Sequence, residues 1–468
     1  MVSRRGFLAG LAGAALIPSA LRPPAAQASA PAAPFLLDAG ETTLTLPGCR
    51  NPTTLWTYGG SWPAEIRLKR GEMAHLLLRN HLKDHTAIHW HGLRIPNAMD
   101  GVPYVTQQPV KNGAEFLYSF APPDPGTFFF HPHCNTVEAL GRGLAGAIII
   151  EDPREDGLFD LDRTLVVKDW RVAGDGSYLS FMTDRGAARA GTFGTRRSIN
   201  GAAAPQIIAP CGARVRLRLL NVDVSRIMTL GAAGAEVSII ATDGNACPPF
   251  AITDWRLGPA MRVDLALVMP SKPGAQVEIQ DIWGQEPFPL AHLVAEGAVI
   301  APDRRPLALP KAELPVADLK SAETFTLSLQ AEVSDPALDA WLKQNRFGDD
   351  ALCRAERLFW AINNKAWPAM DMDKRPPPLA ELKSGRSYVG EIVNHTQHPH
   401  PIHLHGHTFQ VIASSKGPVR GHWADTVLVA PDERVRIAFV AGEPGDWMLH
   451  CHIIEHQETG MMGYIRVV

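Results

Sequence analysis

The side chains best suited to bind a metal lie near the C-terminus, in the run His450-Cys451-His452 and, further on, at His456 and Met461. Successive side chains of an extended strand point to opposite faces, so His450 and His452 would face one side and Cys451 the other. One short segment can therefore serve two metal sites. Cys451 and His456, with Met461 as a weak axial ligand and a third nitrogen or sulfur ligand from elsewhere, would make the two-histidine, one-cysteine site that suits blue copper.

Two simpler interpretations compete with copper: a structural zinc site, or a buried cysteine among surface histidines. Structural zinc usually takes cysteines paired at short CxxC-like spacing. The nearest other cysteine in this chain is Cys353, which is far outside such a spacing from Cys451. The spacing therefore favours copper over zinc.

The chain repeats one pattern three times, and the repeat predicts how many domains it has. In each copy an asparagine follows a glycine by nine residues, and in two copies a His-x-His-Gly motif begins nine residues after the asparagine. The copies are Gly71, Asn80 and His89-Trp90-His91-Gly92; Gly385, Asn394 and His403-Leu404-His405-Gly406; and Gly212 with Asn221, which no histidine motif follows. We therefore expect three sandwich-like domains, with metal chemistry confined to the first and third.

A second repeated segment distinguishes the first domain from the third. It ends in His131-Pro132-His133 in one copy and in His450-Cys451-His452 in the other. Because Pro132 stands at the position of Cys451, and Leu144 at that of Met461, the first domain should not hold a blue copper. The predicted organisation is a signal peptide at 1–28, domains at 29–155, 156–300 and 317–468, and a linker at 301–316.

Composition and periodicity predict an all-β fold. Gly 40 and Pro 39 exceed average usage, which is typical of many short strands joined by turns. The alternating runs Arg262–Val268 and Arg434–Val440 are predicted to be half-buried antiparallel strands. Residues 337–347 carry apolar side chains at helical spacing and could form a short helix. Cys211 and Cys247 could pair within the second domain, although connectivity cannot be deduced from sequence.

The charge of the chain gives no sign of a polyanionic partner. A net charge of −3 and a pI near 6.7 leave no basic footprint for nucleic acid or an anionic membrane surface. At the N-terminus, Arg4-Arg5 precede the apolar run Leu8–Ile17 and the small residues Ala26-Gln27-Ala28, an arrangement similar to a twin-arginine (Tat) export signal. The apolar run is too short for a permanent membrane anchor. We therefore expect the Tat machinery as a partner and a periplasmic or secreted protein; the alternative is an uncleaved anchor.

Four motifs together resemble those of the multicopper oxidases, the family of laccases and bacterial cuprous oxidases. They are His89-Trp90-His91-Gly92, His131-Pro132-His133, the run from His400 to His407, and His450-Cys451-His452 with His456 and Met461. The resemblance covers nearly the whole mature chain. It implies three cupredoxin-like Greek-key β-sandwich domains and four copper ions: one type 1, one type 2 and two type 3.

The resemblance assigns a ligand set to each copper. These sets are His400, Cys451, His456 and Met461 for type 1; His89 and His403 for type 2; and His91, His131, His133, His405, His450 and His452 for the type 3 pair. Each His-x-His pair presents its imidazoles to one side of a strand, so the eight histidines can converge only where the first and third domains meet. His398 offers a competing His-Pro position, but only the distance from His400 to His403 matches the family.

Asp100 resembles the acid that the family places beside the type 2 site, where it would relay protons. The alternative is an ordinary turn aspartate before Gly101. Many bacterial relatives carry a glutamate directly after the second type 1 histidine, whereas this chain has Gln457, which cannot titrate. The part of Glu455 and Glu458 in proton delivery stays open.

The implied activity is one-electron oxidation of a reductant, with electrons passing through Cys451, coupled to four-electron reduction of dioxygen to water. Phenols and aromatic amines are the first substrate class, because the methionine-rich insertion of many cuprous oxidases is absent and only Met370 and Met372 lie near the start of the third domain. A metallo-oxidase for Cu(I) or another low-valent metal is the second hypothesis. A copper-free structural protein of the cell envelope is the third, and the complete ligand set argues against it.

Overall fold

Strands make up nearly all of the regular structure. The structure is a computed structural model that describes residues 33–301, 307–331, 358–367 and 375–468, so the predicted signal peptide and the predicted helix at 337–347 lie outside it. In these ranges the helices are short: α1 (Thr136–Arg142), α2 (Asp184–Ala187), α4 (Ile454–Glu458) and the 3-10 turns η1 (Asn97–Met99) and η2 (Pro153–Glu155). None of these described helices is long and apolar enough to cross a membrane. The all-β prediction is confirmed.

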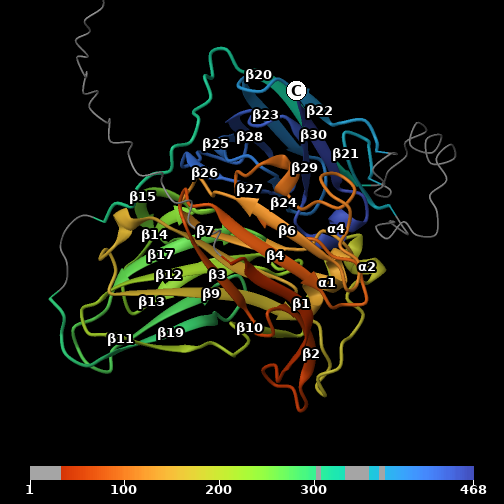
Figure 1. The fold of residues 1–468 in the computed structure, drawn as a ribbon. Helices are drawn as coiled ribbons and strands as arrows, with labels where there is room; N and C mark the ends of the chain where they lie inside the picture. The colour runs from red at the N-terminus through yellow and green to blue at the C-terminus, as the bar shows by residue number, and fades with distance from the viewer. Residues whose placement is uncertain (1–32, 302–306, 332–357, 368–374) are drawn as a thin grey trace, which may run out of the picture. The chain divides into compact units, whose positions relative to one another are not determined.

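Within the described ranges the strands form six sheets, grouped in three pairs around three apolar cores (Figure 1). The first pair has the strand orders β2-β1-β4-β6 and β3-β8-β7-β5. Its strands are β1 (Phe35–Leu44), β2 (Thr53–Tyr58), β3 (Ala64–Lys69), β4 (Ala74–Asn80), β5 (His89–His91), β6 (Glu115–Phe120), β7 (Gly126–His131) and β8 (Gly146–Glu151). We call this pair the first sandwich.

The second sandwich has the orders β10-β9-β12-β17-β14-β15 and β11-β19-β18-β13-β16. Its strands are β9 (Leu161–Trp170), β10 (Arg196–Ile199), β11 (Gln206–Pro210), β12 (Arg214–Asn221), β13 (Met228–Ala233), β14 (Val237–Thr242), β15 (Asn245–Ala251), β16 (Trp255–Leu257), β17 (Arg262–Val268), β18 (Gln276–Asp281) and β19 (Phe288–Glu296).

The third sandwich has the orders β21-β20-β23-β28-β25-β26 and β22-β30-β29-β24-β27. Its strands are β20 (Glu323–Ala331), β21 (Trp360–Ile362), β22 (Ala380–Leu382), β23 (Ser387–Asn394), β24 (His400–Leu404), β25 (Phe409–Ser414), β26 (His422–Ala424), β27 (Thr426–Val429), β28 (Arg434–Val440), β29 (Gly445–Cys451) and β30 (Met462–Val467).

Strand alternation separates the cores from the histidines. In the first sandwich β5 pairs with β7, with Trp90 opposite Phe130 and His89 opposite His131. Trp90 and Phe130 pack into the apolar core, so the histidines lie on the other face. In the third sandwich β24 pairs with β29 in the same way, with His403 opposite His450 outside the core.

The strand predictions differ in their outcome. β28 has the half-buried pattern expected of Arg434–Val440, but six of the seven residues of β17 are buried, so the half-buried prediction for Arg262–Val268 is wrong. The polar face of β17 lies against the first sandwich, where Thr127 of β7 donates a 2.7 Å hydrogen bond to Asp264. Hydrogen bonds across this contact, including one from Arg218 of β12 to Thr127 at 2.8 Å, take the place of water.

The possible disulfide between Cys211 and Cys247 is not formed, because both residues are free thiols. Cys211 lies within the apolar core of the second sandwich, and Cys247 packs against the same core. Both therefore act as small apolar side chains.

Candidate metal centres

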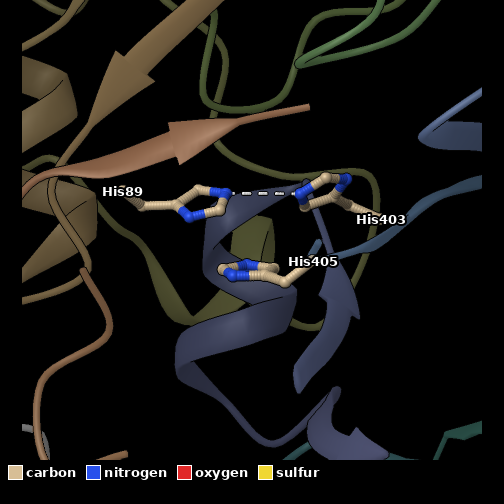
Figure 2. Close-up of side chains that lie close together, drawn as sticks. All are labelled: His89, His403 and His405. Atoms are coloured by element: carbon tan, nitrogen blue, oxygen red, sulfur yellow. Dashed lines mark hydrogen bonds between the residues drawn. The ribbon is translucent and has the colours of Figure 1, made fainter. Parts of the chain in front are cut away.

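Eight buried histidines from the first and third sandwiches come together in what we call the histidine group. Its members are His89, His91, His131, His133, His403, His405, His450 and His452. Figure 2 shows His89 and His403 approaching each other, with His405 beside them; the Nε2 atoms of the first two are 3.4 Å apart. A second contact between the sandwiches joins Nε2 of His131 to Nε2 of His452 at 3.4 Å. Within the third sandwich, Nε2 of His405 lies 3.1 Å from Nε2 of His450.

Fixed oxygen atoms hold one nitrogen of most of these rings. Three Nδ1 atoms lie against backbone carbonyls: His89 at Asp100 (2.9 Å), His131 at Pro132 (3.0 Å) and His450 at Cys451 (3.1 Å). Such a bond fixes the tautomer and leaves the lone pair of Nε2 for another partner. Several buried nitrogens have no hydrogen-bond partner among the described residues: His91 Nδ1, His452 Nδ1 and both nitrogens of His133.

The electrostatics and spacing of the histidine group fit bound metal ions. Burial, with the neighbouring imidazoles as a further cause in most of them, lowers the pKa of His91, His131, His133, His403, His405, His450 and His452. The rings are therefore neutral and able to ligate. Two nitrogens each about 2 Å from one ion in tetrahedral geometry would be about 3.3 Å apart, close to the 3.1 to 3.4 Å found here. Imidazole donors suit copper.

Asp100 lies against the histidine group, at the end of η1. Its buried side chain places Oδ2 2.9 Å from Nδ1 of His405 and Oδ1 3.2 Å from Nδ1 of His89. It also has the turn position before Gly101, whose φ is +79° and where a Cβ would lie 1.7 Å from the carbonyl oxygen of Ile88. The turn and the contact with the histidines thus coexist, because the turn sets where the carboxylate lies.

Asp425 is a second acid at the histidine group, and the sequence analysis did not identify it. Its Oδ1 lies 2.9 Å from Nε2 of His91 and 3.5 Å from Nδ1 of His403. Burial alone would raise the pKa of Asp425, but the Arg262 guanidinium, which donates two hydrogen bonds to this carboxylate, holds it well below its usual value. An aspartate inside the largely apolar run 423–429 is the signal that could have revealed it.

His400, Cys451 and His456 form a second buried group, the cysteine group. The Cys451 Sγ lies 3.5 Å from Nδ1 of His400 and 3.6 Å from Nδ1 of His456, and these nitrogens are 3.0 Å apart. The outer nitrogens are held by Thr396 Oγ1, at 2.8 Å, and by the carbonyl of Arg189. Burial raises the pKa of the Cys451 thiol and lowers that of His456 to about 3. A thiolate is therefore favoured here only when a cation replaces the proton.

The end of β29 joins the two groups. His450 and His452 belong to the histidine group, and Cys451 between them points into the core of the third sandwich. Met461 is buried in that core, and its carbonyl accepts a hydrogen bond from the Cys451 amide at 3.0 Å. His398, the competing position, is only partly buried and its ring lies beside Trp360.

Known proteins share this sequence and fold. Family profiles described as "Multicopper oxidase" match residues 40–155 and 354–468. The crystal structure of a multi-copper oxidase from Pseudomonas thermotolerans is 35% identical with a TM-score of 0.82, and the match covers 93% of this chain and 99% of that one. The chain belongs to the multicopper oxidase family.

Relatives of this multicopper oxidase carry different names. Multicopper oxidase MmcO of Mycobacterium tuberculosis is 29% identical over 98% of this chain and 95% of its own length. A laccase of Pycnoporus cinnabarinus is 25% identical over 84% and 82% of the two chains. The structure of a Campylobacter jejuni multicopper oxidase, described as a metallo-oxidase, is 25% identical with a TM-score of 0.72 over 92% and 90%. Copper is the metal that this family implies.

The two acidic residues on either side of His456 in this multicopper oxidase are bound by threonines outside both groups. The Glu455 carboxylate accepts hydrogen bonds from the amide and hydroxyl of Thr192 in the second sandwich. Glu458 accepts a 2.9 Å hydrogen bond from the amide of Thr136 in α1. Gln457 is buried, and its Oε1 has no hydrogen-bond partner among the described residues.

Proposed function

We propose that this oxidase couples the one-electron oxidation of phenols or aromatic amines to the four-electron reduction of dioxygen to water. The observation that supports the proposal most strongly is the arrangement at the end of β29, where Cys451 of one group stands between two members of the other. Bound copper would supply one-electron redox chemistry and an affinity for dioxygen. The protein residues would supply the copper ligands, the covalent path between the two groups and the groups that deliver protons.

We assign to each copper the ligand set that the motifs imply. His400, Cys451, His456 and Met461 would hold a type 1 copper, His89 and His403 a type 2 copper, and His91, His131, His133, His405, His450 and His452 a type 3 pair, which makes four ions. Cys451 is covalently joined through the backbone to His450 and His452. Electrons therefore have a short path from one group to the other.

The outer edge of the cysteine group is the entry point that we propose for electrons. His456 Nε2 donates a hydrogen bond to the carbonyl of Arg189, a residue whose side chain is exposed. A reductant docked at Arg189 would be separated from the imidazole by one hydrogen bond. The histidine group, by contrast, is buried, so bulky reductants cannot reach it and a small molecule such as dioxygen would bind there.

Asp100 would move protons. Its Oδ2 is held 2.9 Å from Nδ1 of His405, on the opposite side of the ring from the 3.1 Å contact with His450. A proton held at this carboxylate is therefore next to the histidine group but does not occupy a ligand position. General acid catalysis of this kind requires such proximity.

We further propose three cupredoxin-like domains at residues 29–155, 156–300 and 317–468, joined by a linker at 301–316, with export to the periplasm or medium by the Tat machinery. The support for export is the Arg4-Arg5 motif and the cleavage-like Ala26-Gln27-Ala28. Replacing both arginines with lysine should leave the precursor in the cytoplasm. Mature protein outside the cell in normal amounts would contradict this.

The test of the activity is oxygen uptake by purified, copper-loaded protein with three reductants: a phenol, an aromatic diamine and Cu(I). We expect uptake with the organic reductants and about four copper ions per chain, as the family resemblance implies. A protein that binds no copper would instead be a structural member of the family. Uptake with Cu(I) alone would identify the second candidate, a metallo-oxidase, which the name of the Campylobacter jejuni relative supports.

A further inference from the structure

A buried cluster of three charged side chains lies where all three sandwiches meet, and we call it the interface triad. Arg262 begins β17, and Asp243 follows β14, so both belong to the second sandwich, which contributes no predicted ligand. Asp425 lies between β26 and β27 of the third sandwich. Each side chain is at most 2% exposed. Charges this deeply buried persist only when they are paired and hydrogen-bonded.

The pairing in the triad is directional. Arg262 donates through Nη1 to Asp425 Oδ1 at 2.9 Å and through Nη2 to Asp425 Oδ2, which is the two-pronged geometry that only arginine provides. Two further N–H groups of Arg262 donate to backbone carbonyls, one to Ala260 at 3.0 Å and one to Thr127 at 3.3 Å. Contacts within the first and second sandwiches therefore hold the guanidinium in the orientation in which it binds Asp425 of the third.

Asp243 fixes the backbone around Asp425. Its Oδ1 accepts a 2.9 Å hydrogen bond from the amide of Arg262, and its Oδ2 accepts 3.2 Å hydrogen bonds from the amides of Asp425 and Thr426. Asp425 is thus held at its backbone by one member of the triad and at its carboxylate by the other.

The fixed carboxylate in turn orients two members of the histidine group. Asp425 Oδ1 accepts from Nε2 of His91 at 2.9 Å, so the proton is on Nε2 and the partnerless Nδ1 is left for a metal. The backbone carbonyl of the same residue accepts from Nδ1 of His403 at 2.8 Å, which leaves its Nε2 facing His89. One residue therefore sets the tautomers of a ring from the first sandwich and of a ring from the third.

There is no spare room around these contacts. A Cβ added at Gly92, directly after His91, would lie 2.3 Å from Oδ2 of Asp425 and 2.7 Å from Nη2 of Arg262. The first sandwich therefore closes directly over the arginine–aspartate pair. A rearrangement of the pair must also move the chain that carries His91.

We propose that Arg262 is a positioning residue for the histidine group. Through Asp425 it sets the orientation of His91 and His403, so the second sandwich shapes the copper cluster although it supplies none of the ligands. The inference rests on the proposed copper cluster. It also gives a reason why the strand that carries Arg262 is buried on both faces.

The test compares Arg262→Lys and Arg262→Gln with the matched control Arg218→Lys. Arg218 is similarly buried in the neighbouring strand β12 and also bridges the sandwiches, donating to Thr127 Oγ1 at 2.8 Å and to Asp162. Among the described residues it has no hydrogen bond or ion pair with Asp100, Asp425 or the histidine group. The readouts are copper ions per chain, the thiolate-to-copper absorption, the electron paramagnetic resonance spectrum of the type 2 copper, and Tm.

We expect both Arg262 variants to keep the thiolate-to-copper absorption but to lose copper from the histidine group, or to show a shifted type 2 hyperfine splitting. Arg218→Lys should keep the parental copper content and spectrum even if its Tm falls as much as the Tm of the Arg262 variants. Parental copper content and type 2 spectrum in the Arg262 variants would overturn the inference. A parental protein that binds no copper would overturn the proposed function instead.

A double variant keeps the test decisive if the single variants do not fold. Arg262→Gln with Asp425→Asn removes both charges of the arginine–aspartate pair and leaves Asp243 with its three backbone amide donors, so the Tm should recover toward the parental value. The neutral amide is a weaker acceptor for His91 than the carboxylate, so the type 2 signal should still be altered. Recovery of both Tm and the parental spectrum would show that the pair only stabilises the interface.

Discussion

At the scale of single residues, the chemistry depends on side chains held in one protonation state. The Cys451 thiol is buried where its ionisation is unfavourable, and burial raises its pKa. The two histidines next to it in the cysteine group are neutral, because burial lowers the pKa of both. A soft cation that displaces the thiol proton can therefore bind the Cys451 sulfur and two neutral imidazoles.

Replacing Cys451 with serine should abolish the thiolate-to-copper absorption and the oxidase activity, because the thiolate is the soft ligand of the cysteine group. Copper in the histidine group should remain, since none of its imidazoles changes. Visible absorption and copper content measure the two effects. Cys49→Ser, at a half-buried cysteine outside both groups, is the control and should keep the band. An undiminished band in Cys451→Ser would refute the assignment.

Asp100→Asn should slow reoxidation of the reduced enzyme by oxygen by about 100-fold, the lower end of the range for general acid catalysis. Asparagine keeps an oxygen acceptor for His405, so the ring orientation is preserved while the ability to carry a proton is lost. Reduction of the type 1 copper should be nearly unchanged, because Cys451 faces the other side of β29. Stopped-flow absorption follows both steps. Reoxidation at the parental rate would mean that the protons travel by another route.

At the scale of elements, α4 illustrates how a marginal segment is held by its surroundings. Five residues are too few for a stable isolated helix. The helix carries His456, and its Ile454 amide donates to the carbonyl of Val224 at 2.9 Å. Glu455 is bound by Thr192 and Glu458 by Thr136. The second and first sandwiches therefore fix the position of His456, a member of the cysteine group in the third.

Thr192→Val should lower the free energy of unfolding by about 1–3 kcal/mol, the cost of leaving a buried polar group without its partner. The Thr192 hydroxyl donates to Glu455 Oε1, a buried carboxylate oxygen that valine cannot satisfy. Urea unfolding measures the change. Thr324→Val, at an exposed position of β20, is the matched control and should change stability by less than about 0.5 kcal/mol. Equal effects of the two substitutions would show that the contact with α4 contributes nothing.

At the scale of the whole molecule, the histidines couple folding to pH. The copper-free protein buries neutral imidazoles whose pKa is lowered by burial, to about 3 for His456 and to about 4 for His407. In the unfolded chain the same side chains titrate near their ordinary value of about 6.5. The unfolded state therefore binds more protons below that pH, and acid favours unfolding.

The free energy of unfolding of the copper-free protein should be largest above pH 6.5 and should decrease as the pH falls toward 4. At pH 5 each such histidine contributes a loss of about 2 kcal/mol. Urea titrations at pH 7.5 and 5 measure the difference. Copper-loaded protein should lose less, because a bound ion competes with protons for the same nitrogens. A copper-free protein equally stable at both pH values would show that the imidazoles are accessible to protons when folded.

The sequence by itself determined the features that depend on local geometry. Strand alternation predicts that His89 and His91, or His450 and His452, share a face while Cys451 takes the other, and the structure brings these side chains together in two groups. The all-β fold was predictable for the same reason, because period-two patterns and turn residues are properties of short segments. The apolar faces of these strands pack into three cores.

Only the tertiary structure decided which polar side chains are buried and what they contact. Arg262 and Asp425 are 163 residues apart in sequence, and Thr192 and Glu455 are 263 apart, yet each pair is in direct contact. The alternation of Arg262 and Asp264 with apolar residues in β17 looks the same whether that face meets water or the polar side chains of another sandwich. Periodicity reports only that a face is polar. The packing of the sandwiches decides which residues the polar face contacts, and no local pattern contains that information.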